Sequence, residues 1–180
     1  MLRTIITAAA LTAGLTSIAS AQNFGLNPAY GTLNLSAGFN NDPRAVNLQS
    51  GGSIPASNVS SSCRGYIADA PDVRVNYSSG SLPLIFSVAS GVDTTLVINA
   101  PDGSWYCDDD SGNGVNPSVR FGSPASGQYD VWVGTYASAS LQSATLYVSE
   151  LSSLYGAWGR GADPAPRTRR RQSLGGVDFY

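Results

Sequence analysis

The sequence predicts an all-β fold, an antiparallel β-sandwich or barrel, and three observations support this prediction. Apolar residues alternate with polar ones, so that Val73, Val75 and Tyr77 fall on one side of a single run, which is the period of a strand with one buried face. Gly, Pro, Ser and Asp breakers separate such runs at short intervals. One glutamate, Glu150, lies between residues 22 and 159, and this composition disfavours long exposed helices.

The runs that fit short strands follow one another along the chain. In order they are residues 32–35, 73–77, 84–89, 94–99, 118–121, 129–133 and 144–148. Pro101-Asp102-Gly103 is the sharpest turn signal, and it separates the run 94–99 from a second strand-like run that ends in three consecutive carboxylates. No segment has the periodicity of a long helix, so we expect at most a single helical turn near residues 58–62.

The first 21 residues resemble an export signal. Met1-Leu2-Arg3 leads into an apolar stretch that ends at Ala19-Ser20-Ala21, the small-x-small pattern of a signal-peptidase site. We therefore expect residues 1–21 to be removed and the mature chain to begin at Gln22, in a periplasm or outside the cell. The stretch is too short to span a membrane, and no later stretch approaches the necessary length, so no transmembrane segment is expected.

Composition divides the mature chain into a body, residues 22–152, and a tail, residues 153–180. Residues 22–159 contain four arginines and ten carboxylates, whereas residues 160–180 contain five arginines and two aspartates. We expect one β-sandwich domain followed by a flexible Gly/Pro/Arg-rich tail, because such a mixture cannot bury enough apolar surface to order itself. A basic arm of this kind also suits anionic surfaces. Nucleic acid is not expected as the partner of an exported, otherwise acidic chain.

Cys63 and Cys107 are the two cysteines of the chain. In an oxidising compartment a lone pair of cysteines usually forms one disulfide, which is the interpretation we favour. A reactive thiol would need a neighbouring base or cation. Arg64, which follows Cys63 in the sequence, is the one candidate. A metal site built from two cysteines without histidine is the poorest alternative.

The segment from Asp108 to Gly114 has the composition of a calcium-binding loop. Three adjacent carboxylates are followed by Ser, Gly, Asn and Gly, which let the backbone curl so that side chains and carbonyl groups converge. Calcium prefers about six to eight oxygen ligands in irregular geometry. The spacing is not that of an EF-hand, because Val119 stands where that motif has glutamate. The candidate ligands are Asp93, Asp102, Asp108, Asp109, Asp110 and Asn113; a solvated acidic turn remains the open alternative.

Catalysis is disfavoured, because the chain contains no histidine and no lysine. A serine peptidase of the trypsin kind needs histidine to accept the serine proton, and a Ser-Lys dyad needs lysine. Asp93-Thr94-Thr95 and Asp110-Ser111-Gly112 are similar to the signature of aspartic peptidases. They lie too close in the sequence for the two lobes that each supply one aspartate. No pair of carboxylates is suitably placed for a glycosidase.

Four aromatic residues offer a second candidate surface. Trp105, Tyr106, Trp132 and Tyr136 could together form a stacking platform for sugars or peptides, and the alternative is that they pack a second buried face. Tyr129, which follows Gly127-Gln128, is similar to a tyrosine corner, a structural tether in β-sandwiches.

Four features in a fixed order resemble the pre-peptidase C-terminal domain family over about residues 70–150. They are Asp-Thr-Thr-Leu-Val-Ile at 93–98, Pro-Asp-Gly at 101–103, the acidic loop at 108–114 and Ser-Gly-Gln-Tyr-Asp-Val-Trp-Val at 126–133. The resemblance implies a small secreted jelly-roll-like sandwich of about eight to ten strands. It also implies an accessory role beside secreted peptidases, with calcium or matrix polymers as ligands of some members. Stand-alone relatives are often labelled trypsin-like peptidases.

The sequence thus favours an exported, non-catalytic binding or envelope accessory module, stabilised by calcium, whose partner is an extracellular protein or polysaccharide. The first alternative is a secreted peptidase or peptidase-associated protein. The second is a structural envelope protein without a small ligand.

Overall fold

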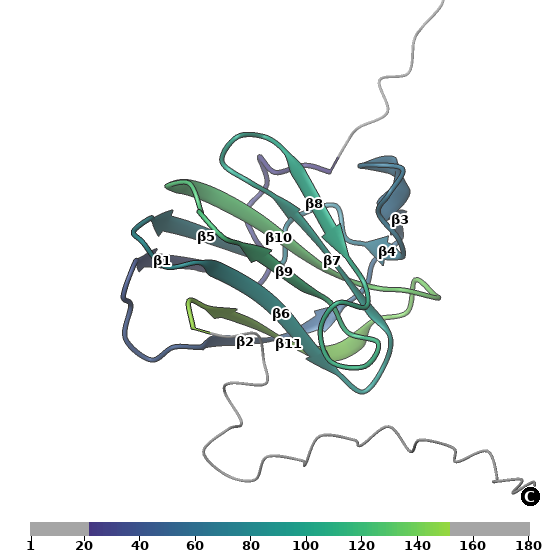
Figure 1. Cartoon of the computed structure of the whole chain (residues 1–180). Coiled ribbons are helices and arrows are strands. Elements are labelled where there is room, and N and C mark those ends of the chain that lie inside the picture. The colour runs from purple at the N-terminus through teal and green to yellow at the C-terminus, as the bar shows by residue number, and fades with distance from the viewer. Residues whose placement is uncertain (1–21, 152–180) are drawn as a thin grey trace, which may run out of the picture.

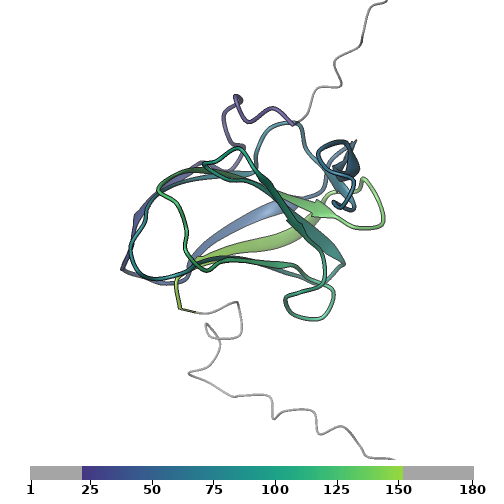
Figure 2. The same cartoon turned by 45° about the horizontal axis from the view of Figure 1, so that its top comes forward.

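Two β-sheets packed face to face make up residues 22–151, the part of the chain that the computed structural model describes (Figure 1). The predicted β-sandwich is confirmed. The expected signal segment 1–21 and the expected tail lie outside the described residues. In the turned view of Figure 2 the two layers are seen with the chain passing repeatedly between them.

The first sheet, here sheet A, has seven strands arranged around β10. Its members are β1 (Thr32–Ser36), β3 (Ile54–Pro55), β4 (Tyr66–Ile67), β5 (Val73–Ser78), β7 (Thr94–Asn99), β8 (Trp105–Asp108) and β10 (Gly127–Thr135). Strand β10 pairs with β5 and β4 along one side and with β7 along the other. All strand pairs of sheet A are antiparallel except the pair of β1 with β5, which is parallel.

The second sheet, sheet B, has four antiparallel strands in the order β2-β11-β6-β9. They are β2 (Arg44–Ser50), β6 (Leu84–Ser90), β9 (Ser118–Phe121) and β11 (Gln142–Ser149). The described residues therefore contain eleven strands, slightly more than the sequence predicts, because β3 and β4 have two residues each. The one helix among them is a 3-10 turn, η1 (Ala56–Asn58), which begins just before the expected position.

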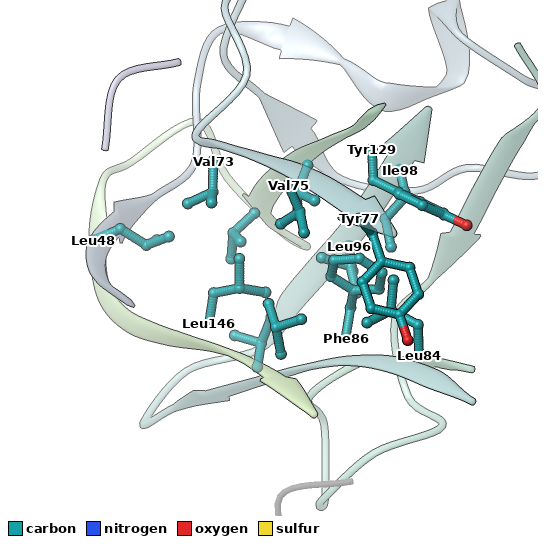
Figure 3. Packing of buried hydrophobic residues seen from close by; sticks show 14 of the residues in the cluster. Leu48, Val73, Val75, Tyr77, Leu84, Phe86, Leu96, Ile98, Tyr129 and Leu146 are labelled. Carbon is teal, nitrogen blue, oxygen red and sulfur yellow. The ribbon is translucent and has the colours of Figure 1, made fainter. Parts of the chain in front are cut away.

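The main core lies between the two sheets (Figure 3). Among its members are Leu48, Val73, Val75, Tyr77, Leu84, Phe86, Leu96, Ile98, Tyr129 and Leu146, which are labelled in Figure 3. In β10 the predicted alternation is confirmed, because Tyr129, Val131 and Val133 belong to this core whereas Trp132 belongs to a second cluster. The Tyr129 hydroxyl donates to the carbonyl of Ala125 at 2.8 Å, which is the bond of a tyrosine corner.

A second, smaller core covers the outer face of sheet A. It consists of Ala56, Cys63, Ile67, Val97 and Trp132, with Val59, Trp105 and Cys107 packed against it. Cys63 and Cys107 form the predicted disulfide, which joins the segment before β4 to β8. Strand β7 is consequently buried on both faces along its whole length, and its apolar residues, Leu96, Val97 and Ile98, are consecutive rather than alternating with polar ones.

No helix of residues 22–151 has both the length and the apolar character needed to cross a membrane.

Candidate functional site

The acidic loop and the β6–β7 loop lie side by side at one end of the sandwich, at the lower right of Figure 1. Two backbone and side-chain contacts join them. The Thr94 N–H donates to the carbonyl of Val115 at 3.3 Å, and the Asn116 side chain donates to the carbonyl of Ser90 at 3.1 Å. We call this region, residues 91–93 with residues 109–117, the loop end.

Asp108 closes the acidic loop on itself. One carboxylate oxygen accepts the Ser111 hydroxyl at 2.6 Å, and the other accepts the N–H groups of Ser111 at 3.0 Å and Ser118 at 2.8 Å. A carboxylate with three such donors is already satisfied by its own loop. Asp108 therefore shapes the loop, and any cation would have to compete with these bonds for it.

Asn116 holds the loop against the sandwich, a role for which the sequence gives no separate signal. The residue is 7% exposed. Its side-chain oxygen accepts the Thr94 hydroxyl at 2.6 Å, while its amide nitrogen also donates to the carbonyl of Asn113 at 3.4 Å. A buried amide that is satisfied on both sides fixes the start of β7 relative to the acidic loop.

Asp93 has the electrostatics expected of a cation ligand. Its Oδ1 atom is buried and has no hydrogen-bond partner among the described residues. Partial burial raises the pKa of this carboxyl above its usual range, and the nearby charges of Asp110 and Asp109 raise it further. The charges of Asp109 and Asp110 thus act on Asp93 across the loop end.

The other candidate ligands are placed differently. Asp109 is half-buried, whereas Asp110 and Asn113 are exposed. Throughout residues 22–151, no three His, Cys, Asp or Glu side chains are gathered tightly enough to hold a metal ion. The carboxylates of Asp93, Asp109 and Asp110 would consequently have to come closer to one another to coordinate a metal ion.

Asp102 lies at the opposite end of the sandwich. It belongs to the β7–β8 turn, seen at the top of Figure 1, and its carboxylate accepts the Ser104 N–H at 2.9 Å. The six residues of β7 separate this turn from Asp93, which is about 20 Å of extended strand. The structure therefore does not bring Asp102 to the loop end.

The four candidate platform residues do not share one surface. Trp132 is fully buried and stacks on Trp105, with ring centroids 5.4 Å apart. Tyr106 points to the other face of β8 and packs edge-on against Phe121 at 4.8 Å. Of the two tryptophans, Trp105 alone keeps an accessible surface.

Trp105 and Tyr136 lie in two separate hollows, whereas the exposed Tyr106 lines neither of them. One, of about 440 Å³, is lined by Trp105 with Phe24 and Gln128 among others. Another, of about 330 Å³, is lined by Tyr136 with Arg64 among others. A ligand could stack on Trp105 in one hollow or on Tyr136 in the other, and the two hollows share no lining residue.

No model of a known protein family matches the chain, and no curated protein matches it. Among solved structures, the chain is similar to the pre-peptidase C-terminal domain of a collagenase from Bacillus anthracis. The identity is 14%, the match covers 69% of this chain and 99% of that chain, and the TM-score is 0.42. It is also similar to Aeromonas hydrophila PliG, a periplasmic lysozyme inhibitor of g-type lysozyme, with 12% identity, 66% and 96% coverage and a TM-score of 0.33. These values describe a distant likeness of fold.

Proposed function

We propose that the protein is an exported, non-catalytic accessory module that binds an extracellular partner and takes up calcium at its loop end. Asp93, Asp109 and Asp110 are the ligands in this proposal. The observation that carries it is the buried Oδ1 atom of Asp93, which has no hydrogen-bond partner among residues 22–151 and lies near the charges of two further carboxylates. A divalent cation would supply the missing partner and offset the repulsion.

The chemistry of the loop end favours calcium among the common cations. All candidate side-chain donors are oxygen atoms, which suit hard cations. Asp109 and Asp110 lie in a loop rich in Ser, Gly and Asn, and such a loop can adapt to irregular coordination more readily than to the octahedral geometry that magnesium demands. Asp108 holds the loop in place and leaves its neighbours available.

The disulfide supports the exported location. Disulfides persist mainly in oxidising compartments outside the cytosol. Cys63 is 1% exposed, and its bond to Cys107 lies in the second core, so the bridge is an integral part of the packing. Together with the sequence pattern of residues 1–21, this supports secretion or a periplasmic location.

The absence of histidine and lysine from the whole chain supports a non-catalytic role. Asp93 and Asp110 lie near enough for the charge of Asp110 to raise the pKa of Asp93. A carboxylate pair of this kind could in principle share a proton, as in aspartic peptidases. Both residues, however, belong to one loop end of one sandwich, without the two lobes that enclose a peptide substrate.

The partner in this proposal is an extracellular protein or polysaccharide. The hollow beside Trp105 supports this class, because an accessible indole next to polar side chains suits stacking on a sugar ring or an aromatic side chain. Oligomeric state does not enter the proposal. The arginine-rich tail, whose contact with anionic surfaces stays a prediction, lies outside the described residues.

Calcium titration calorimetry on three forms of the protein tests the metal part of the proposal. The wild-type protein and the Asp102→Asn variant should bind calcium alike, because Asp102 lies at the other end of the sandwich. The Asp93→Asn variant should lose most of the affinity, since it removes a charged ligand while it preserves the shape. Equal binding by all three forms, or none by the wild type, would contradict the proposed site.

A further inference from the structure

Gln22 would be the first residue of the chain after the expected cleavage. From this residue onward the chain is hydrogen-bonded to the rest of the fold. The Gln22 side-chain amide donates to the carbonyl of Ala68, and the Asn23 N–H donates to the carbonyl of Asp69 at 3.3 Å. The same Asp69 carbonyl also accepts the indole N–H of Trp132 at 3.3 Å. The start of the described chain therefore lies directly against the second core.

Arg74 holds the next residues in place. One nitrogen of its guanidinium donates to the carbonyl groups of Phe24 at 2.6 Å and Leu26 at 3.1 Å, while another makes an ion pair with Asp130 at 2.7 Å. Because Asp130 is 2% exposed, this ion pair is shielded from water. The segment is thus fixed on both sides of residue 24, and residue 22 cannot easily swing away.

Gln22 itself is 1% exposed, and its Oε1 atom has no partner among the described residues. Cleavage behind Ala21 would place an α-ammonium group on this residue. A buried position disfavours the charged form of an amine, because the charge loses its hydration. It also leaves the N–H groups of the ammonium in need of partners.

We propose that Gln22 becomes pyroglutamate after export, and that this neutral ring is the buried N-terminus of the mature protein. The freed α-amino nitrogen of Gln22 attacks Cδ of its own side chain, and the new N–Cδ bond closes a five-membered lactam. The Cδ–Nε2 bond breaks, and Nε2 leaves as ammonia with the proton that the amine gives up. The step consumes no oxidant, metal or second substrate.

The buried position of Gln22 favours both the reaction and its product. Burial increases the fraction of neutral amine, which is the nucleophile. The lactam carries no charge and keeps one N–H, so it needs fewer buried hydrogen-bond partners than an ammonium group. The inference rests on the export part of the proposed function and is independent of its calcium site.

The test is the intact mass and N-terminal sequence of the full chain, expressed with its own residues 1–21 in a secreting host. The wild-type protein should begin at residue 22, have a mass lower by one ammonia than the unmodified chain, and be blocked to stepwise sequencing. The Gln22→Asn variant is the matched control. It lacks one methylene, so a five-membered lactam cannot form, and its N-terminus should be open.

A second measurement tests the buried placement. Pyroglutamyl aminopeptidase should release the ring from the denatured protein and fail to release it from the native one. Release from the native protein would overturn the buried N-terminus. A wild-type chain that begins at residue 22 with its full mass would overturn the cyclisation alone. A chain that still begins at Met1 would overturn the inference together with the export part of the proposed function, whereas the calcium titration would be unaffected.

Discussion

The carboxylate of Asp72 accepts the backbone N–H of Val133 at 2.7 Å in the centre of sheet A. Val133 lies between Val131, the last residue of β10 that pairs with β5, and Thr135, which pairs with β4. The Asp72 side chain therefore takes the place of a strand partner at Val133. The Asp72 N–H donates in turn to the carbonyl of Val131 at 2.8 Å. Asp72 is 3% exposed, and burial raises its pKa from 3.8 to about 7, although the bond from Val133 opposes part of this effect.

The raised pKa of Asp72 predicts a specific pH dependence of stability. In the folded state this carboxyl holds its proton up to about pH 7, whereas in the unfolded chain it releases the proton near pH 3.8. Its contribution to the free energy of unfolding should therefore be most favourable below pH 4, fall as the pH rises to 7, and stay level above that. The loss is on the order of 4 kcal/mol.

The Asp72→Asn variant should lack this part of the pH dependence, because asparagine keeps an acceptor for Val133 and does not ionise. Urea unfolding at several values between pH 4 and 8 measures the difference between the two proteins. The variant should gain on the wild type as the pH rises across this range. A difference that stays constant with pH would show that Asp72 does not titrate as its burial predicts.

Gly134 predicts a steric effect in the same strand. A Cβ atom at this position would lie 2.5 Å from the carbonyl oxygen of Tyr66 and 2.6 Å from a methyl group of Thr95. The Gly134→Ala variant should therefore lose about 1 to 3 kcal/mol of stability, the usual cost of overpacking. The Gly91→Ala variant is the matched control, because a Cβ atom at residue 91 meets nothing within 4 Å.

Chemical denaturation at equilibrium compares these two variants with the wild type. The Gly91→Ala variant should unfold at nearly the wild-type midpoint. Equal losses in both variants would show that the general effect of adding a methyl group, rather than contact with Tyr66, destabilises the sheet.

The disulfide predicts a large effect on stability. Cys63 and Cys107 are 44 residues apart, and the chain-entropy model gives about 4 kcal/mol for a loop of this size. The double variant Cys63→Ala/Cys107→Ala should lose roughly this amount. Because Cys63 is 1% exposed, the native wild-type protein should also resist reduction by dithiothreitol until it is partly unfolded. Rapid reduction of the native protein would contradict the buried position of the bridge.

Much of the sandwich can be predicted from the sequence, because its strands have one buried face and alternate accordingly. Strand β2 escapes this pattern: Val46 and Leu48 face the core from within a run of polar and small residues, and two apolar positions are a weak signal. The second core is harder still to foresee. Residues 51–72 show no alternation of apolar and polar residues. Their backbone folds back on itself so closely that a Cβ atom on Gly52 would lie 2.1 Å from the carbonyl carbon of Ile67.

The sequence names the acidic residues of the candidate site but not their arrangement. Three adjacent carboxylates are visible in the sequence, but strand pairing decides which other residues lie near them. Asp93 precedes β7 and Asp108 ends β8, so the hairpin returns the chain to the same end, whereas Asp102 in the turn stays at the far end. Trp132 likewise became buried against Trp105, because residues Ala56, Cys63 and Ile67, from a segment without a sequence signal, pack around it.

Thermal unfolding of the protein with calcium and with chelator tests the proposed calcium site most directly. At calcium 100-fold above the dissociation constant, binding adds about 2.7 kcal/mol. This should raise the midpoint of the wild-type protein and of the Asp102→Asn variant by roughly 5 to 10 °C. The Asp93→Asn variant should show little or no rise. An unchanged wild-type midpoint, or an equal rise in the Asp93→Asn variant, would contradict a calcium site at the loop end.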